Sequence, residues 1–196
     1  MPCRRLRIAL GCSLALAACA TGDRLPSGFA AGLAETPEGT PARLWILDDH
    51  VISASVALGP GSLPAAVRQS LDAVAPRGEV MFQGREWGPR GEGYRIDKRY
   101  QIDGAEHTRS ALIASDGTVL ERSHSVPVKE APQDVLAAAL RVGPHVQSVE
   151  IVSGREHEEY WRCVVADRLG RMFVATVGMD GRLVGAMRRV SARVDV

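Results

Sequence analysis

Apolar and polar residues alternate along several segments of the chain, as they do in β-strands with one buried face. In the longest such segment, residues 94–102, charged or polar side chains separate the apolar residues Tyr94, Ile96, Tyr100 and Ile102. Side chains two positions apart share one face of a strand. This segment is therefore predicted to be a strand with one apolar and one solvated face. Residues 52–58 alternate in the same way, with one face made of Ile52, Ala54, Val56 and Leu58.

Two other segments show the spacing of helices. Between Pro64 and Pro76, apolar residues at positions 67, 71 and 74 form one stripe. Proline suits the first turn of a helix and interrupts one further along, and Ser62 is placed to cap this helix. The second segment, residues 132–142, repeats the stripe and is followed by Gly143-Pro144. Both segments are predicted to be short helices.

Three pairs of residues are predicted to form hairpin turns. Asp116-Gly117 and Asp180-Gly181 each lie between apolar runs, and Asp-Gly is typical of turns that need positive φ. Asp48-Asp49 stands at the corresponding place in a third segment, where aspartate tolerates positive φ at some cost relative to glycine. Together with His50 this pair could also form a small metal or acid–base site. We favour the turn, because the two sister segments keep it without the ligands.

The spacing of these features indicates an internal duplication. Asp116 lies 68 positions after Asp48 (116 − 48), and the same offset pairs Leu44 with Leu112, Pro64 with Pro132 and Val67 with Val135. Similarity at a fixed offset is typical of repeated structural units. We therefore predict an α+β fold of two tandem units, each a short helix packed on an antiparallel β-sheet, preceded by an extra β-hairpin. Residues 42–128 form the first unit with its leading hairpin, and residues 129–196 form the second.

Each unit resembles the PepSY domain family, more specifically the tandem PepSY-like units of beta-lactamase-inhibitor-like proteins. In the first unit the resemblance is carried by Pro64, Val67, Tyr94, Asp116-Gly117 and Val126, and in the second by Pro132, Val135, Tyr160 and Asp180-Gly181. It implies a helix packed on one face of an antiparallel sheet. It also implies non-enzymatic roles, such as the inhibition or chaperoning of peptidases or the binding of other envelope proteins.

The N-terminus has the features of an export signal. Arg4, Arg5 and Arg7 precede an apolar run that ends at Ala18, and a run of about a dozen residues is too short for a membrane span, which needs roughly 20. The run ends in Leu-Ala-Ala-Cys, which resembles the lipobox of bacterial lipoproteins and implies that Cys19 is lipidated after cleavage. The alternative is an ordinary signal cleaved near Ala20. We expect residues 1–18 to be a lipoprotein signal peptide and residues 19–41 a flexible tether. Ala20 favours the periplasmic face of the outer membrane.

Charge and motifs exclude several classes of function. Lys and Arg number 24 against 23 Asp and Glu, so no basic excess favours nucleic acid as a partner. The chain contains no G-x-S-x-G, S-x-x-K or H-E-x-x-H motif. Cys163 alternates with Trp161 and Val165 and is predicted to be a small buried hydrophobe. We expect no catalysis, no cofactor and no metal. The glycine-rich segment 84–93 is predicted to be a loop, in which Arg85 and Arg90 could meet an anion.

One set of side chains is a candidate binding face. On the repeated outgoing strands, Arg122, His124 and Arg188 replace apolar residues in the middle of an otherwise apolar face, and unpaired charge is costly to bury. With Trp161 and Tyr100 nearby, this face could bind a partner protein, since interfaces favour Arg and aromatic residues; a simple solvated sheet face is the alternative. We predict a lipid-anchored envelope module that binds another envelope protein, such as a peptidase that it restrains. The alternatives are a structural outer-membrane lipoprotein and an envelope hydrolase or redox enzyme that uses Cys163 or the acidic loops.

Overall fold

The computed structural model describes residues 5–8, 16–17, 26–155 and 158–195. Most of these residues form strands, which are β1 (Arg5–Ile8), β2 (Leu16–Ala17), β3 (Pro41–Leu47), β4 (His50–Ala57), β5 (Glu79–Gly88), β6 (Gly91–Ile102), β7 (Ala105–Ile113), β8 (Val119–Val126), β9 (His145–Gly154), β10 (Glu159–Ala166), β11 (Met172–Gly178) and β12 (Leu183–Asp195). The helices are α1 (Phe29–Ala34), α2 (Ala65–Val74), the 3₁₀ turn η1 (Val128–Glu130) and α3 (Gln133–Leu140). Within the described ranges, no helix is long and apolar enough to cross a membrane.

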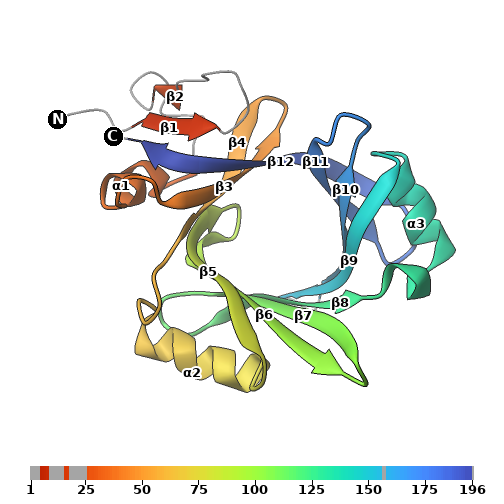
Figure 1. Cartoon of the computed structure of the whole chain (residues 1–196), viewed down its shortest axis with the longest axis horizontal. Helices are drawn as coiled ribbons and strands as arrows, with labels where there is room; N and C mark the ends of the chain where they lie inside the picture. The colour runs from red at the N-terminus through yellow and green to blue at the C-terminus, as the bar shows by residue number, and fades with distance from the viewer. Residues whose placement is uncertain (1–4, 9–15, 18–25, 156–157, 196) are drawn as a thin grey trace.

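Strands β3 to β12 form a closed antiparallel barrel of ten strands (Figure 1). Each strand pairs with the next along the chain, and β12 closes the ring by pairing with β3 from Arg188↔Ile46 to Arg193↔Pro41. Strand β1 lies outside the ring and pairs with the last residues of β12, beginning at Arg5↔Asp195. The ring of paired strands therefore starts at β3.

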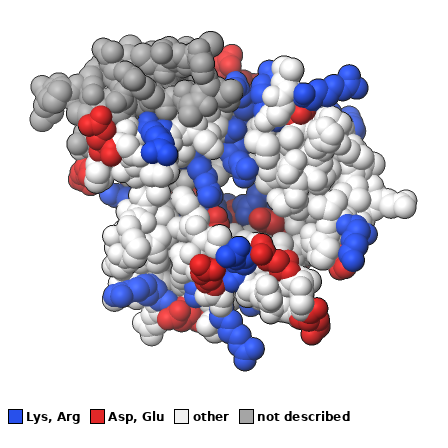
Figure 2. All heavy atoms as spheres, in the orientation of Figure 1, with Lys and Arg blue, Asp and Glu red and all other residues white. Residues whose placement is uncertain are grey.

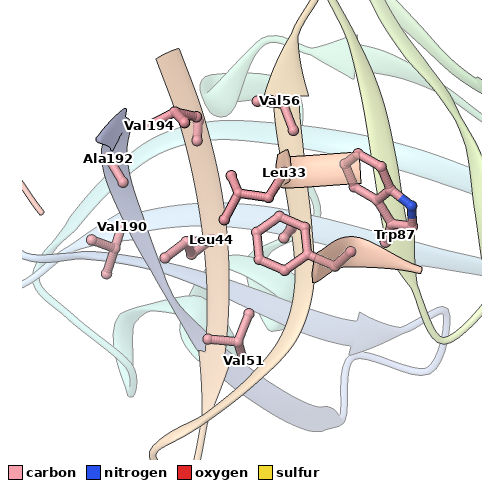
Figure 3. Close-up of a cluster of buried hydrophobic side chains, with 11 residues drawn as sticks. Leu33, Leu44, Val51, Val56, Trp87, Val190, Ala192 and Val194 are labelled. Atoms are coloured by element: carbon pink, nitrogen blue, oxygen red, sulfur yellow. The ribbon is translucent and has the colours of Figure 1, made fainter. Parts of the chain in front are cut away.

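The apolar cores lie between the outer surface of the barrel and the helices. Helix α1 covers β3, β4 and β12 (Figure 3), α2 covers β6 and β7, and α3 covers β9, β10 and β11. Each helix directs one apolar stripe at the sheet, for example Val67 and Leu71 of α2, because residues three or four apart share a helix face. Burying such stripes supplies the main stabilisation of the fold.

Helix α1 packs against a single large side chain of β5. Phe29 contacts Trp87 edge to face, with 5.5 Å between ring centroids, and both side chains are at most 2% exposed. Gly32 of the helix lies so close to the Trp87 ring that a Cβ atom there would collide with it. The range expected to be a tether, residues 19–41, thus contains a helix that is packed on the barrel.

The inner face of the barrel is polar, because neighbouring residues of a strand point to opposite sides. In β6, Ile96 faces the outer core while Arg95 lines the interior. Arg95 is nonetheless only 9% exposed, and the interior residues Glu86 and Glu121 are 6% and 4% exposed. The predicted strand at 94–102 is confirmed, but the face that was expected to be solvated is the inside of a barrel.

The predicted α+β fold and the resemblance to tandem PepSY-like units are wrong. Two independent helix-on-sheet units would each keep their own sheet, whereas here β8 pairs with β9 and β12 pairs with β3, so all ten strands share one closed sheet. Residues that correspond in the expected tandem repeat also point to opposite sides of the sheet. Leu44 is buried under α1, while Leu112, its counterpart at an offset of 68, lines the barrel interior.

Several local predictions are confirmed. Helices α2 and α3 lie inside the predicted segments, although α2 begins after Pro64 without a side-chain cap from Ser62. Asp48 and Asp49 form a turn with positive φ of 47° and 64°, and Gly117 and Gly181 also have positive φ.

One strand departs from its predicted face. A β-bulge in the β3–β4 pair adds a residue on β4 and changes the phase of its alternation. Ile52 therefore lines the interior, while Ala54 and Val56 remain in the outer core.

Candidate functional site inside the barrel

The barrel encloses a cavity of about 270 Å³, and every strand from β3 to β12 contributes to its wall. Figure 2 looks onto one opening of the barrel and shows acidic and basic side chains within it. The charged residues that line the cavity are Arg43, Glu86, Arg90, Arg95, Asp97, Glu121, Glu150, Arg162 and Arg189. The cavity is thus a charged space enclosed by a sheet whose outer face carries the apolar cores.

Glu121 of β8 is the centre of a buried ion network. Its Oε1 accepts hydrogen bonds from Arg95 Nη1 at 2.6 Å and from Arg162 Nη1 at 2.8 Å, and its Oε2 accepts one from the Tyr160 hydroxyl at 3.2 Å. The two arginines come from β6 and β10, which do not pair with each other. The network therefore links strands across the interior of the barrel.

Each arginine of the network has a second carboxylate. Arg95 forms a two-pronged pair with Glu86 of β5, at 3.1 and 3.0 Å. Arg162 donates from Nη2 to Glu150 of β9 at 2.7 Å. Two-pronged arginine–carboxylate pairs fix orientation as well as charge, so these five side chains hold one another in place.

The network keeps Glu121 and Glu150 ionised at neutral pH. Burial by itself raises the pKa of Glu121, but Arg95 and Arg162 outweigh it and hold the pKa well below the ordinary value of 4.5. Arg162 likewise outweighs burial and lowers the pKa of Glu150. Burial, together with Glu121, raises the pKa of Tyr160 to about 12. These carboxylates are weak bases and this phenol is a weak acid, so the network is suited to holding charge rather than to moving protons.

The hairpin between β5 and β6 reaches over this network. Arg90, at its tip, donates to the Leu120 carbonyl at 3.2 Å and lies 3.7 Å from Glu121. Gly91 supplies the turn with a φ of 89°. Pro89 and Arg90 both line the cavity, so the hairpin forms part of its wall. Of the two arginines expected to meet an anion, Arg90 is in the cavity, whereas Arg85 pairs with Glu35 and Glu92 outside it.

A second pair of arginines lies in the cavity apart from the network. Arg43 of β3 donates to Asp97 at 3.3 Å and stacks over the Phe82 ring. Arg189 of β12 makes no hydrogen bond or ion pair with any residue in the described part of the chain. Burial, and then repulsion from Arg43, lower the pKa of Arg189. Arg189 is therefore a half-buried cation whose charge nothing nearby fully compensates.

Apolar side chains form the remaining wall. Trp45 of β3 is the cross-strand partner of Arg189, and Val174 of β11 is the partner of Met187 of β12. All of them, and Val164 of β10, line the cavity. The cavity thus has apolar residues on β3, β10, β11 and β12 near Arg189, besides the charged residues of the network on β5, β6, β8, β9 and β10.

The sequence-predicted binding residues lie on the outer surface of the barrel or beneath it. Arg122 and His124 are exposed on β8, and Arg188 is exposed on β12, four strands away in the sheet. Trp161 is only 6% exposed in the core under α3. Tyr100 stacks on His107 and contacts Arg109, whose register partner is His124. The structure brings Tyr100 near His124 but does not bring the five together, and Cys19 lies outside the described residues.

Cys163 is placed as predicted. Its side chain is fully buried in the outer core beside α3, and burial raises the pKa of its thiol to about 11. A thiol with such a pKa is almost entirely protonated at neutral pH, and the thiolate is the nucleophilic form.

The cavity residues were not identified from the sequence, because the charged residues of each strand were considered separately and not as partners across strands. The available signal was a single charged residue inside an apolar run, as with Arg162 in Tyr-Trp-Arg-Cys-Val-Val and Glu150 in Ser-Val-Glu-Ile-Val. A charge at the middle of a strand needs either solvent or a partner. Oppositely charged residues at the centres of several strands could therefore have indicated a shared polar interior.

Comparison with known proteins yields likeness to solved structures only. No family model and no curated protein matches the chain. A putative periplasmic protein from Bacteroides eggerthii is similar with a TM-score of 0.48 and 15% identity, over 65% of this chain and 90% of that one. A DUF2874 family protein from Bacteroides uniformis is similar with a TM-score of 0.47 and 17% identity, over 64% and 88%. Likeness of this degree assigns no function to the chain.

Proposed function

We propose that this chain is a non-catalytic binding protein of the cell envelope that holds a small ligand inside its barrel. The observation that carries the proposal is the cavity of about 270 Å³ inside the barrel, which is lined by both charged and apolar residues. Sites for small molecules are concave and combine apolar walls with a few orienting polar groups, and the interiors of β-barrels commonly supply them.

The energetics of the interior support a binding role. The attraction between two buried charges offsets the cost of removing them from water only when their geometry is excellent. Replacing such a pair by well-packed apolar residues often leaves the protein equally stable or more stable. A barrel that needed only stability would be served by an apolar filling. Here at least four carboxylates and five arginines occupy the interior instead, which is typical of a site that recognises polar groups.

The state of the titratable groups supports binding over catalysis. Glu121 and Glu150 are paired and held ionised, while burial raises the pKa values of the Tyr160 hydroxyl and the Cys163 thiol to about 12 and 11. A general acid or base works best with a pKa near the working pH. None of these groups meets that condition at neutral pH.

The envelope location is proposed from the N-terminal sequence. Arginines, a short apolar run and Leu-Ala-Ala-Cys precede the described body, in the order of a lipoprotein export signal. On this proposal the barrel is held at a membrane through lipid on Cys19, most simply at the periplasmic face of the outer membrane.

Mass analysis of the mature N-terminus tests the anchor. We expect the protein purified from the native membrane to begin at Cys19 and to carry a diacylglycerol thioether and an amide-linked acyl chain. The Cys19→Ala variant serves as the control and is expected to keep residues 1–18 or to lose the acyl mass. An unmodified mature chain that begins elsewhere would refute the anchor without affecting the barrel.

A cavity-filling substitution tests ligand binding. Met187 lines the cavity, whereas the next residue, Arg188, is exposed on the outer face. We expect at least one of benzoate, benzylamine and benzyl alcohol to bind the wild type with a Kd of about 1 mM or tighter. Met187→Trp fills the site and should weaken that binding at least about tenfold, whereas Arg188→Trp should leave it within about twofold. Isothermal titration calorimetry measures both.

Two outcomes would contradict ligand binding in the cavity. If none of the three probes binds, or if Met187→Trp and Arg188→Trp weaken binding equally, the cavity is not the ligand site. Near-ultraviolet circular dichroism shows whether each variant keeps its tertiary packing. Val174→Leu, a smaller filling change opposite Met187, gives the same comparison if the tryptophan variant does not fold.

A further inference from the structure

The cavity lining contains one more positive than negative charge, and this excess can be assigned to one residue. Five arginines and four carboxylates line the cavity, which leaves a formal excess of one positive charge. Arg95, Arg162, Arg90 and Arg43 each lie within 4 Å of a carboxylate oxygen, with Glu121 shared among the first three. Arg189 has no such partner in the described part of the chain, so the excess charge belongs to it.

Arg189 is a partly buried cation for which no ion pair is formed within the described residues. Burying a guanidinium without a partner is unfavourable. The pKa of Arg189 is accordingly lowered, first by burial and then by repulsion from Arg43. A carboxylate accepts the parallel N–H groups of a guanidinium with matching geometry. Arg43 contacts Asp97 through one nitrogen only, which leaves further N–H groups as a second donor.

Three apolar side chains lie on the cavity wall beside Arg189. Trp45 lies directly across from it on β3, Met187 is two residues away on the same face of β12, and Val174 lies opposite Met187 on β11. These residues offer a flat ring and two aliphatic surfaces next to the cation. A fully hydrated anion would leave them in contact with water, whereas an anion with an apolar body would cover them.

We propose that the cavity binds a small amphiphilic monocarboxylate, with Arg189 as its anchoring cation and Trp45, Met187 and Val174 as the walls around its apolar body. A single excess positive charge is matched by one negative charge, while a phosphate dianion would bring an uncompensated charge into an enclosed space. This proposal rests on the proposed function of the cavity and adds the chemical class of its ligand. Arg43 is the supporting donor on the neighbouring strand.

The test is calorimetric titration of the whole protein with benzoate, hexanoate, benzyl alcohol and inorganic phosphate. We expect benzoate or hexanoate to bind the wild type more tightly than benzyl alcohol or phosphate does. Arg189→Gln should weaken carboxylate binding by about tenfold to 100-fold, since a hydrogen bond to a charged group is lost. Benzyl alcohol should bind the wild type and this variant alike. Arg189→Lys, which keeps the charge, should recover part of the affinity.

Arg188→Gln is the matched control, because it removes the same charge one residue away on the outer face. It should leave carboxylate affinity within about twofold of the wild type. The thermal midpoint supplies a second readout. Without ligand, Arg189→Gln should unfold at the same temperature as the wild type or a higher one, because it removes an uncompensated buried charge.

The outcomes separate this proposal from the function on which it rests. The anchoring role is overturned if Arg189→Gln binds benzoate and hexanoate as tightly as the wild type, if benzyl alcohol binds as tightly as both, or if phosphate binds more tightly. If Met187→Trp still blocks benzyl alcohol in those cases, the cavity is a ligand site of another class. Absence of binding by all four probes overturns the carboxylate proposal, and the proposed function is overturned as well if benzylamine also fails to bind.

Discussion

Glu121→Leu is expected to lower the free energy of unfolding by about 3–5 kcal/mol. Glu121 is 4% exposed and pairs with both Arg95 and Arg162. Removing one member of a buried ion pair leaves its partners desolvated and uncompensated, which costs about that amount. Urea unfolding followed by circular dichroism measures the change. Glu106→Leu is the matched control: its carboxylate is 61% exposed and lies 3.6 Å from Arg99, so its loss should cost about 1 kcal/mol or less.

The same network sets the response to acid. Because the pKa of Glu121 is lower in the folded barrel than its ordinary 4.5, the stability it contributes is fully present above about pH 4.5. That contribution is lost as the pH falls from 4.5 toward the lowered pKa. Glu150, whose pKa is also lowered, acts in the same direction. The stability of Glu121→Leu should therefore fall less steeply than that of the wild type below pH 4.5.

A triple variant shows whether the cost arises from unpaired charge. Adding Arg95→Met and Arg162→Met to Glu121→Leu removes the orphaned cations and should restore much of the lost stability. If Glu121→Leu lost no stability, the network would not form in the folded protein. If Glu106→Leu lost as much stability as Glu121→Leu, the cost would not be specific to the buried network.

The local structure of this chain could be predicted because local signals determine it. Asp48-Asp49 forms the expected turn, and the stripe of Val67 and Leu71 marks the buried face of α2. Turn chemistry and helical spacing act over a few residues, so they can be read from one segment at a time. Helix α1 was missed since it has only six residues, with Phe29 and Leu33 as its brief apolar signal.

The closure of the barrel could not be predicted in the same way. It depends on pairs such as Val190↔Leu44 and Val126↔Val149, of which the first joins strands from opposite ends of the described body. Alternation tells which residues of a strand share a face, but not which face is turned inward. In β6 the pattern separated Arg95 from Ile96 correctly, and the interpretation of the charged face as solvated was wrong.

The candidate site follows from closure and shares its difficulty. Glu121, Glu150 and Arg162 lie on the neighbouring strands β8, β9 and β10, and closure of the sheet turns the face that they share toward the interior of the barrel. Arg122 and His124 were chosen because they interrupt an apolar face, yet their neighbours Glu121 and Ser123 are the residues that point inward. One position along a strand separates the outer surface from the cavity.

The three tryptophans lie in different environments, two in the outer apolar cores and one at the polar cavity. Trp87 and Trp161 are 1% and 6% exposed in the clusters under α1 and α3, whereas Trp45 lines the cavity. Trp87→Ala is expected to cost about 3–5 kcal/mol, as large-to-small changes of buried aromatics do. Phe29→Ala, on the α1 side of the same contact, should cost about as much and serves as a second variant if Trp87→Ala does not fold.

The most direct test of a barrel with apolar cores outside and a polar cavity inside is the comparison of Trp87→Ala with Trp45→Ala by urea unfolding. We expect a loss of about 3–5 kcal/mol for Trp87→Ala and about 1 kcal/mol for Trp45→Ala, because Trp45 faces the cavity rather than a packed core. If Trp45→Ala were the more destabilising of the two, the hydrophobic core would lie inside the barrel and the account would be contradicted.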